Sequence, residues 1–215
     1  QGMKARPAEL LPLIPVIGAG IFFRLSQLPG QLLVDDEWHA IHKILMSSGY
    51  QGVFTDFGLA DHCIPLTLLY MFLLKHLWLS EMLMRLPSIA AGFLALLAVF
   101  LLAGRIVGRR AALTAAALLS ISPLHVFYSR LARPYALSML LSFIAVLAFY
   151  FWWTKQGRGW LPAYLCCGIL SVWLLLPSFP LVAGPFGFAM LHSFLERDPM
   201  RGFRRLLPPG IMFGA

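Results

Sequence analysis

The sequence has little charge, few acidic residues and few cysteines. Only 12% of its 215 residues are charged, whereas a soluble domain usually carries about 25% charged residues. This composition excludes an ordinary soluble globular domain. Disorder is also excluded, because 60% of the residues are hydrophobic and 13% are aromatic. The 3 cysteines, of which Cys166 and Cys167 are adjacent in an apolar run and Cys63 stands alone, do not form a disulfide framework.

Apolar runs of membrane-spanning length follow one another along the chain. A crossing helix needs about 20 apolar residues. The runs are residues 10–28, 86–104, 111–129, 134–154 and 159–195. The last is too long for one helix, and Pro177 and Pro180 predict a break within it. The sequence therefore predicts an all-α integral membrane protein, a polytopic bundle of about six transmembrane helices.

The distribution of charge predicts the orientation of this bundle. Residues 65–79 are apolar, but Lys75 and His76 interrupt them and the segment is short for a crossing. If it does not cross, 11 of the 17 basic residues share one side with only three acids. The positive-inside rule then places that side, and the N-terminus, in the cytoplasm. The net charge of +8 is thus interpreted as membrane topology and not as nucleic-acid binding.

The expected organisation follows from these assignments. Gln1-Gly2 before Met3 is interpreted as a remnant of cloning. The segments are a cytoplasmic N-terminus (1–9), the first transmembrane helix (10–28), an outer loop with two interfacial helices and the candidate catalytic acids (29–85), five transmembrane helices (86–195), and a cytoplasmic basic loop that begins a further span (196–215). We expect the chain to be the N-terminal half of a longer protein.

Three acids follow the first predicted span. Asp35, Asp36 and Glu37 precede apolar residues at helical spacing, which predicts an amphipathic interfacial helix over 37–47 with Asp36 as its N-cap. Capping is a sufficient structural explanation for these acids. The functional alternative is a carboxylate at the lipid–water boundary, where low polarity favours basic character.

Histidines of the same outer loop raise the question of a metal site. His39 and His42 share a helix face at i, i+3, and His62 lies further along the loop. Such a pair without a defined third ligand is a weak zinc signal. We assign no metal ligand and expect no cofactor, and a divalent metal near Asp36 stays open.

Two arginines face the predicted outer side, against the prevailing charge bias. Arg130 and Arg133 lie between the spans 111–129 and 134–154. Snorkelling at a helix end explains them structurally. The alternative is an anion site, because the planar donor fork of arginine suits a phosphate group.

These segments together resemble a known family of membrane enzymes. The motifs are Asp-Glu after the first span (36–37), Arg-Leu-Pro-Ser (85–88), Gly-Arg-x-x-Gly-Arg-Arg (104–110), and Ser-Pro-x-His-x-x-Tyr-Ser-x-x-Ala-Arg-Pro-Tyr-Ala-Leu (122–137). In this order they resemble the bacterial C-type glycosyltransferases of the protein O-mannosyltransferase and aminoarabinose-transferase kind. Residues 61–66, Asp-His-Cys-Ile-Pro-Leu, look like a variant of the His-Pro-Pro-Leu stretch of that family.

The resemblance implies a hexosyl- or pentosyltransferase of the bacterial inner membrane, acting on the extracytoplasmic face. It would move a sugar from a polyprenyl-phosphate donor to a lipid, glycan or protein hydroxyl. The resemblance maps a catalytic Asp-Glu motif onto Asp36 and Glu37. From the charges, we expect Asp36 to take the proton of the acceptor hydroxyl, with Glu37 as a partner that tunes it. Arg133, with Arg130, would stabilise the donor phosphate. Asp35, His62 and Tyr135 are supporting candidates.

One departure from the family keeps other functions open. Many relatives have Ser-Gln-Glu-Ala-Arg where residues 129–133 read Ser-Arg-Leu-Ala-Arg, so Leu131 replaces an acid. A non-catalytic module that binds polyprenyl lipid or assists assembly is therefore an alternative. A transporter fragment is a weaker one, because ionisable residues are scarce in the middle of the later spans.

Overall fold

A computed structural model of the chain describes residues 11–55, 63–155, 157 and 159–195. These residues form α-helices, short 3₁₀ turns and one π segment, and no strand occurs among them. The helices are α2 (Leu13–Leu25), α3 (Asp35–Met46), α4 (Tyr50–Thr55), α5 (Ile64–His76), α6 (Glu81–Ala98), α7 (Gly104–Val107), α8 (Arg109–Ile121), α9 (Pro123–Arg130), α10 (Tyr135–Lys155), α11 (Trp160–Leu174) and α12 (Phe179–Leu195). The predicted all-α membrane fold is confirmed.

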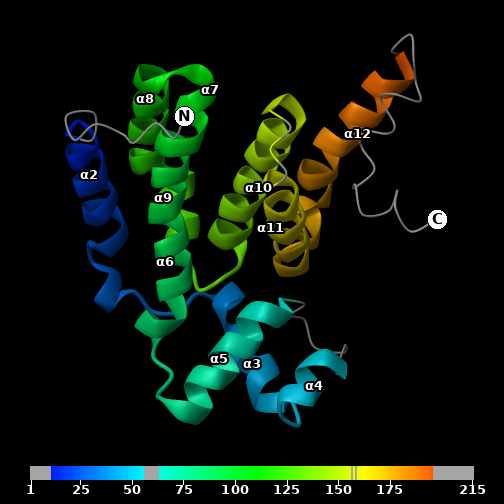
Figure 1. The fold of residues 1–215 in the computed structure, drawn as a ribbon. Helices are drawn as coiled ribbons and strands as arrows, with labels where there is room; N and C mark the ends of the chain where they lie inside the picture. The colour runs from blue at the N-terminus through cyan, green and yellow to red at the C-terminus, as the bar shows by residue number, and fades with distance from the viewer. Residues whose placement is uncertain (1–10, 56–62, 156, 158, 196–215) are drawn as a thin grey trace.

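The helices form two parts (Figure 1). The apolar helices α2 and α6 to α12 stand side by side, and α3, α4 and α5 form a layer at one end of them. The interior of this layer consists of apolar side chains, among which Ala40, Val53 and Tyr70 are at most 2% exposed. The Tyr70 hydroxyl donates to the Met84 carbonyl oxygen at 2.8 Å. This bond fixes the layer to the first turns of α6.

The number of membrane-length helices is smaller than the predicted six. Among the described residues three helical stretches are long and apolar enough to cross, namely Glu81–Val107, Tyr135–Thr154 and Leu176–Leu195. A fourth crossing results if α8 and α9 count as one bent span. The predicted first and fifth spans contain α2 and α11, which are shorter because Leu28-Pro29-Gly30 and Leu176-Pro177-Ser178 form 3₁₀ turns near their C-terminal ends. The predicted break near Pro177 is confirmed.

The bend between α8 and α9 has a local cause. Ser122 has an extended conformation and caps α9, accepting a hydrogen bond from the backbone N–H of His125 at 3.5 Å. Pro123 occupies the first position of α9, where the missing N–H has no cost. The two helices consequently meet at an angle of 60°. This bend directs α9 towards the layer formed by α3 to α5 (Figure 1).

Two interfacial helices were expected in the loop 29–85, and the described part of this loop contains α3, α4 and α5. The start of the first differs from the prediction, because Val34 and not Asp36 is its N-cap. The Glu37 carboxylate accepts a hydrogen bond from the backbone N–H of Val34 at 2.9 Å. This contact from the third helical residue satisfies the backbone N–H of the N-cap. Asp36 is consequently the second helical residue and not the cap.

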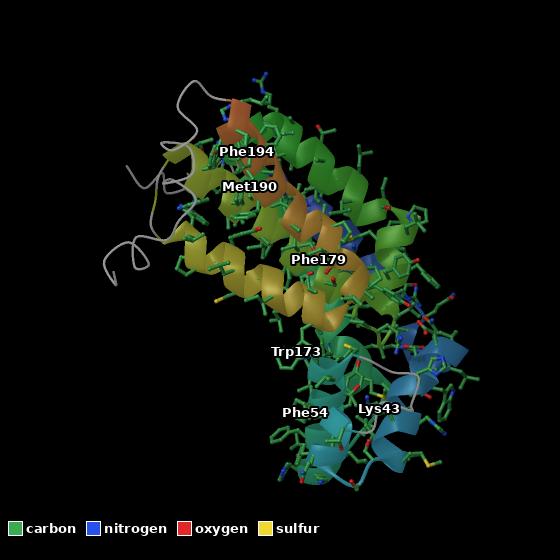
Figure 2. The ribbon with its side chains drawn as sticks, turned by 90° about the vertical axis from the view of Figure 1, so that its right-hand side faces the viewer. Lys43, Phe54, Trp173, Phe179, Met190 and Phe194 are labelled. Carbon is green, nitrogen blue, oxygen red and sulfur yellow. The ribbon has the colours of Figure 1, made fainter. Side chains whose placement is uncertain are left out.

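Large apolar side chains remain exposed on the outer faces of both parts. Figure 2 shows Phe179, Met190 and Phe194 spread along α12, Trp173 at the end of α11, and Phe54 in the layer formed by α3 to α5. Phe179 and Phe194 are 57% and 64% exposed. Such a continuous apolar exterior is typical of a protein whose helices face lipid.

Candidate functional site

Asp36, Arg133 and Tyr135 meet where α3 approaches the loop between α9 and α10. The Arg133 Nε atom lies 3.1 Å from Asp36 Oδ2, and the two side chains form an ion pair. The Tyr135 hydroxyl donates a hydrogen bond to the same oxygen at 3.0 Å. The Asp36 side chain is 41% exposed and that of Arg133 is 13% exposed. A reachable carboxylate and a largely buried guanidinium therefore lie side by side.

The neighbouring acid, Glu37, is enclosed. Its two carboxylate oxygens accept hydrogen bonds from Arg85 Nε at 3.1 Å and Arg85 Nη2 at 3.0 Å. The exposed fractions of the Arg85 and Glu37 side chains are 1% and 0%. Arg85 also donates to the carbonyl oxygens of Gln31 and Leu32, at 2.7 and 2.9 Å. Glu37 is thus an anchor of the site and is closed to substrate in this structure.

The loop that carries Arg133 is attached to the same anchor. The backbone N–H of Ala132 donates to Glu37 Oε1 at 2.6 Å. The Ser88 hydroxyl, one helical turn after Arg85 on α6, donates to the Arg133 carbonyl oxygen at 2.8 Å. Two side chains of α6 therefore connect the start of α3 to the loop before α10. This arrangement fixes the distance between Asp36 and Arg133.

Arg130 has different partners from Arg133. Its Nη1 atom donates to the carbonyl oxygen of Phe23 at 3.3 Å, and its Nη2 atom donates to Gln31 Oε1 at 2.9 Å. Arg130 therefore attaches the end of α9 to the last turn of α2. The structure brings Arg133, but not Arg130, into contact with Asp36.

The remaining predicted residues are Asp35, His62 and the pair His39 and His42. Asp35 is the first residue of α3. His62 lies outside the described residues. In the part of the chain that the structure describes, no three His, Cys, Asp or Glu side chains gather as a metal site would require, so His39 and His42 have no third ligand there.

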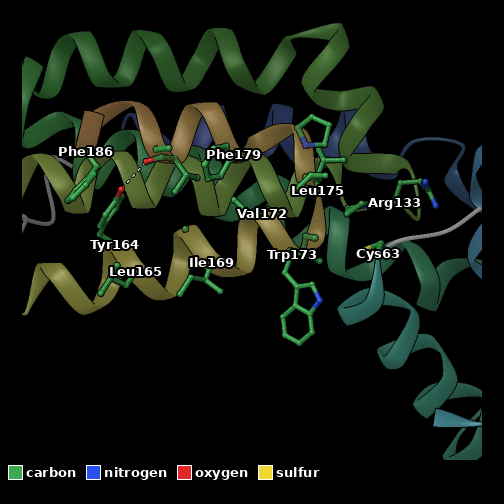
Figure 3. A pocket seen from close by; sticks show the side chains of 17 residues that line it. Cys63, Arg133, Tyr164, Leu165, Ile169, Val172, Trp173, Leu175, Phe179 and Phe186 are labelled. Atoms are coloured by element: carbon green, nitrogen blue, oxygen red, sulfur yellow. Dashed lines mark hydrogen bonds between the residues drawn. The ribbon is translucent and has the colours of Figure 1, made fainter. Parts of the chain in front are cut away.

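An elongated apolar groove of about 1050 Å³ begins beside Arg133. It runs between α11 and α12, and Figure 3 shows Arg133 and Cys63 at one end and Tyr164 and Phe186 at the other. Between the ends it is lined by apolar side chains that include Ile169, Val172, Leu175, Phe179 and Val182. The groove thus combines one cationic end with a long hydrocarbon-like wall.

Two anchoring residues had no role assigned from sequence. Arg85 and Ser88 belong to the Arg-Leu-Pro-Ser motif, which the sequence offers only as part of a family resemblance. Arg85 carried a further signal, because a charged residue at the border of an apolar span must find a partner if it is buried. Its partner, Glu37, is distant in sequence and could not be identified from spacing.

Part of the chain matches a family of known proteins. No curated protein and no solved structure matches the chain significantly. Residues 64–193 match the family described as dolichyl-phosphate-mannose-protein mannosyltransferase. The matched region contains Arg85, Ser88, Arg133 and most of the groove, and it begins after Asp36 and Glu37. Since the match covers more than half of the sequence, the chain belongs to the dolichyl-phosphate-mannose-protein mannosyltransferase family.

Proposed function

We propose that this protein is a membrane glycosyltransferase that moves a sugar from a polyprenyl-phosphate-linked donor to a hydroxyl group of a lipid, glycan or protein. The observation that carries the proposal is the position of the Asp36–Arg133 pair at the cationic end of the apolar groove. A polyprenyl phosphate has the matching shape, with one anionic head and a long apolar chain. The family membership supports the same reaction class.

The chemistry requires one base and one stabiliser of negative charge. In an inverting displacement, the acceptor oxygen forms a bond to the anomeric carbon while the bond from that carbon to the phosphate oxygen breaks. Asp36 takes the proton of the acceptor hydroxyl. Arg133 stabilises the charge that develops on the departing polyprenyl phosphate. The accessible carboxylate and the partly buried guanidinium fit these two roles.

Other residues act through this pair. Tyr135 orients the Asp36 carboxylate through its hydroxyl hydrogen bond. Glu37 and Arg85 hold the backbone on both sides of the site. Arg85 bonds to the Leu32 carbonyl oxygen before α3, and Glu37 bonds to the Ala132 N–H before Arg133. Arg130, which attaches α9 to α2, contributes to the phosphate site only indirectly.

The groove is the proposed location of the prenyl chain. Gly168 allows α11 and α12 to approach closely, because a Cβ atom there would lie 2.6 Å from Val182 Cγ1. The two helices are therefore tightly packed at Gly168, and the groove opens beside this contact.

We place the reaction on the extracytoplasmic face of a bacterial inner membrane, with the N-terminus in the cytoplasm, because the basic loops then satisfy the positive-inside rule.

The test is a transfer assay in liposomes with purified protein. Short-chain polyprenyl phosphates carrying a hexose or a pentose are supplied with lipid, glycan and peptide acceptors, and products are identified by mass spectrometry. We expect turnover with one donor class and its loss in Arg133→Gln, with a smaller effect of Arg130→Gln. Absence of turnover with every combination, together with tight binding of sugar-free polyprenyl phosphate, would instead support the non-catalytic lipid-binding module that Leu131 leaves open.

A further inference from the structure

Another buried arginine, Arg24, lies among the apolar helices, away from the Asp36–Arg133 and Glu37–Arg85 pairs. The Arg24 side chain, in the last turn of α2, is 0% exposed. Its Nη1 atom donates to the carbonyl oxygens of Gly20 and Ser120, at 3.1 and 3.2 Å, and its Nη2 atom contacts His125 Nδ1. Among the described residues no carboxylate forms an ion pair with it. A buried charge among apolar helices is costly, and such residues are commonly functional.

The contact between Arg24 and His125 defines the state of the histidine. A guanidinium in a protein is always protonated and can only donate. His125 Nδ1 must therefore accept, which means that the imidazole is neutral and carries its proton on Nε2. The contact requires a hydrogen-bond acceptor at position 125. A side chain there that cannot accept would leave the buried Nη2 donor of Arg24 without this partner.

Arg24 bridges the two sides of the bend between α8 and α9. Ser120 is in the last turn of α8, where carbonyl oxygens lose their helical partners, and His125 is in the first turn of α9. One guanidinium thus bonds to both helices across the break at Ser122. Gly92 of α6 is required beside it, because a Cβ atom there would lie 3.0 Å from Arg24 Nε and closer still to Ser129.

The last turn of α2 therefore contacts both ends of α9. Arg24 binds the N-terminal end, and the Phe23 carbonyl oxygen accepts from Arg130 at the C-terminal end. Three residues after Arg130 the chain reaches Arg133. We propose that Arg24 is a positioning residue for the reaction, which fixes the bend between α8 and α9 and thereby delivers Arg133 to the donor phosphate. This inference rests on the proposed function.

The role of Arg24 in fixing the bend between α8 and α9 is tested by a distance measurement that does not depend on activity. Spin labels are attached through p-acetylphenylalanine in place of Leu118 on α8 and Phe127 on α9, which are 63% and 51% exposed. In the otherwise unaltered full chain we expect one narrow distance distribution by pulsed electron resonance. Arg24→Met should shift or broaden it, whereas Arg105→Met, at an exposed arginine, should leave it unchanged.

The role of Arg24 in positioning Arg133 at the donor phosphate is tested by the KM for the donor. A variant that merely folds less well loses total activity but keeps its KM, whereas a misplaced Arg133 weakens phosphate binding. We expect Arg24→Met to raise the donor KM by about tenfold, the effect of weakening one charge-assisted hydrogen bond. Arg24→Lys should restore part of the loss, because an ammonium group can still donate to Ser120 and His125.

A second pair of variants keeps the inference testable if Arg24→Met fails to fold. His125→Asn places an amide oxygen near the position of Nδ1 and should retain the distance distribution and the donor KM. His125→Leu removes the acceptor and should change both. An unchanged distance and an unchanged KM in Arg24→Met or His125→Leu would overturn the inference. Absence of transfer by the unmodified chain would overturn the proposed function, and with it the catalytic role of Arg24, while the distance measurement still decides whether Arg24 fixes the bend.

Discussion

Arg85 donates two hydrogen bonds to the carboxylate of Glu37, from Nε at 3.1 Å and from Nη2 at 3.0 Å, in a pair that is almost entirely shielded from solvent. This pair connects α6 to the start of α3. Through the Ala132 N–H, which also donates to Glu37, it reaches the loop that carries Arg133. The candidate site is therefore organised around a charge pair that no substrate can touch.

Removal of one partner of this pair should be strongly destabilising. We expect Glu37→Gln or Arg85→Met to lower the free energy of unfolding by about 3–5 kcal/mol, because each leaves a buried group without its counter-charge. Thermal unfolding of detergent-solubilised protein measures the change. Arg105→Met is the matched control, since that arginine is exposed and such surface changes usually stay within about 0.5 kcal/mol. Equal unfolding temperatures for Arg85→Met and Arg105→Met would contradict the role of the pair.

Two glycines of apolar helices should respond differently to the same substitution. A Cβ atom at Gly92 would overlap Ser129, so Gly92→Ala should destabilise the protein by about 1–3 kcal/mol. A Cβ atom at Gly18 of α2 meets nothing within 4 Å. Gly18→Ala should therefore be neutral or stabilising by up to about 1 kcal/mol, since alanine favours a helix. The unfolding curves of the two variants should separate clearly. Coinciding curves would contradict the close packing of Gly92 against Ser129 and Arg24.

The groove predicts a dependence on the length of the prenyl chain. Ala183 lines it from α12, and Ala183→Phe should fill part of it. The KM for a long-chain donor should then rise by at least about tenfold, because each buried methylene group is worth about 0.8 kcal/mol. A donor with only a few isoprene units should be affected much less. Leu118→Phe, on the exposed face of α8, is the control and should change neither value; the same loss for both chain lengths would place the prenyl chain elsewhere.

Much of the fold could be predicted from composition and periodicity. Long uncharged runs predicted α6 and α10, and Pro177 and Pro180 predicted the division between α11 and α12. The number of spans could not be obtained in this way. Apolar residues continue through turns such as Leu176-Pro177-Ser178, so a hydrophobic run is longer than the helix that it contains.

The site was predictable only where local sequence defines it. Asp36 and Arg133 were candidates because of their residue types and their expected side of the membrane, and the structure brings them into contact. The partners of Glu37, Arg24 and Arg130 depend on which helices are neighbours. Hydrophobic periodicity shows which face of a helix is buried, but it does not identify the helix that covers that face.

The role of Asp36 as the catalytic base is tested by the turnover number of Asp36→Asn in the liposome transfer assay. The amide cannot accept the acceptor proton, and general base catalysis contributes about 10²–10⁴-fold. We therefore expect kcat to fall by at least about a hundredfold, with an unchanged unfolding temperature and retained binding of sugar-free polyprenyl phosphate. Turnover at the level of the unaltered protein would show that Asp36 is not the base.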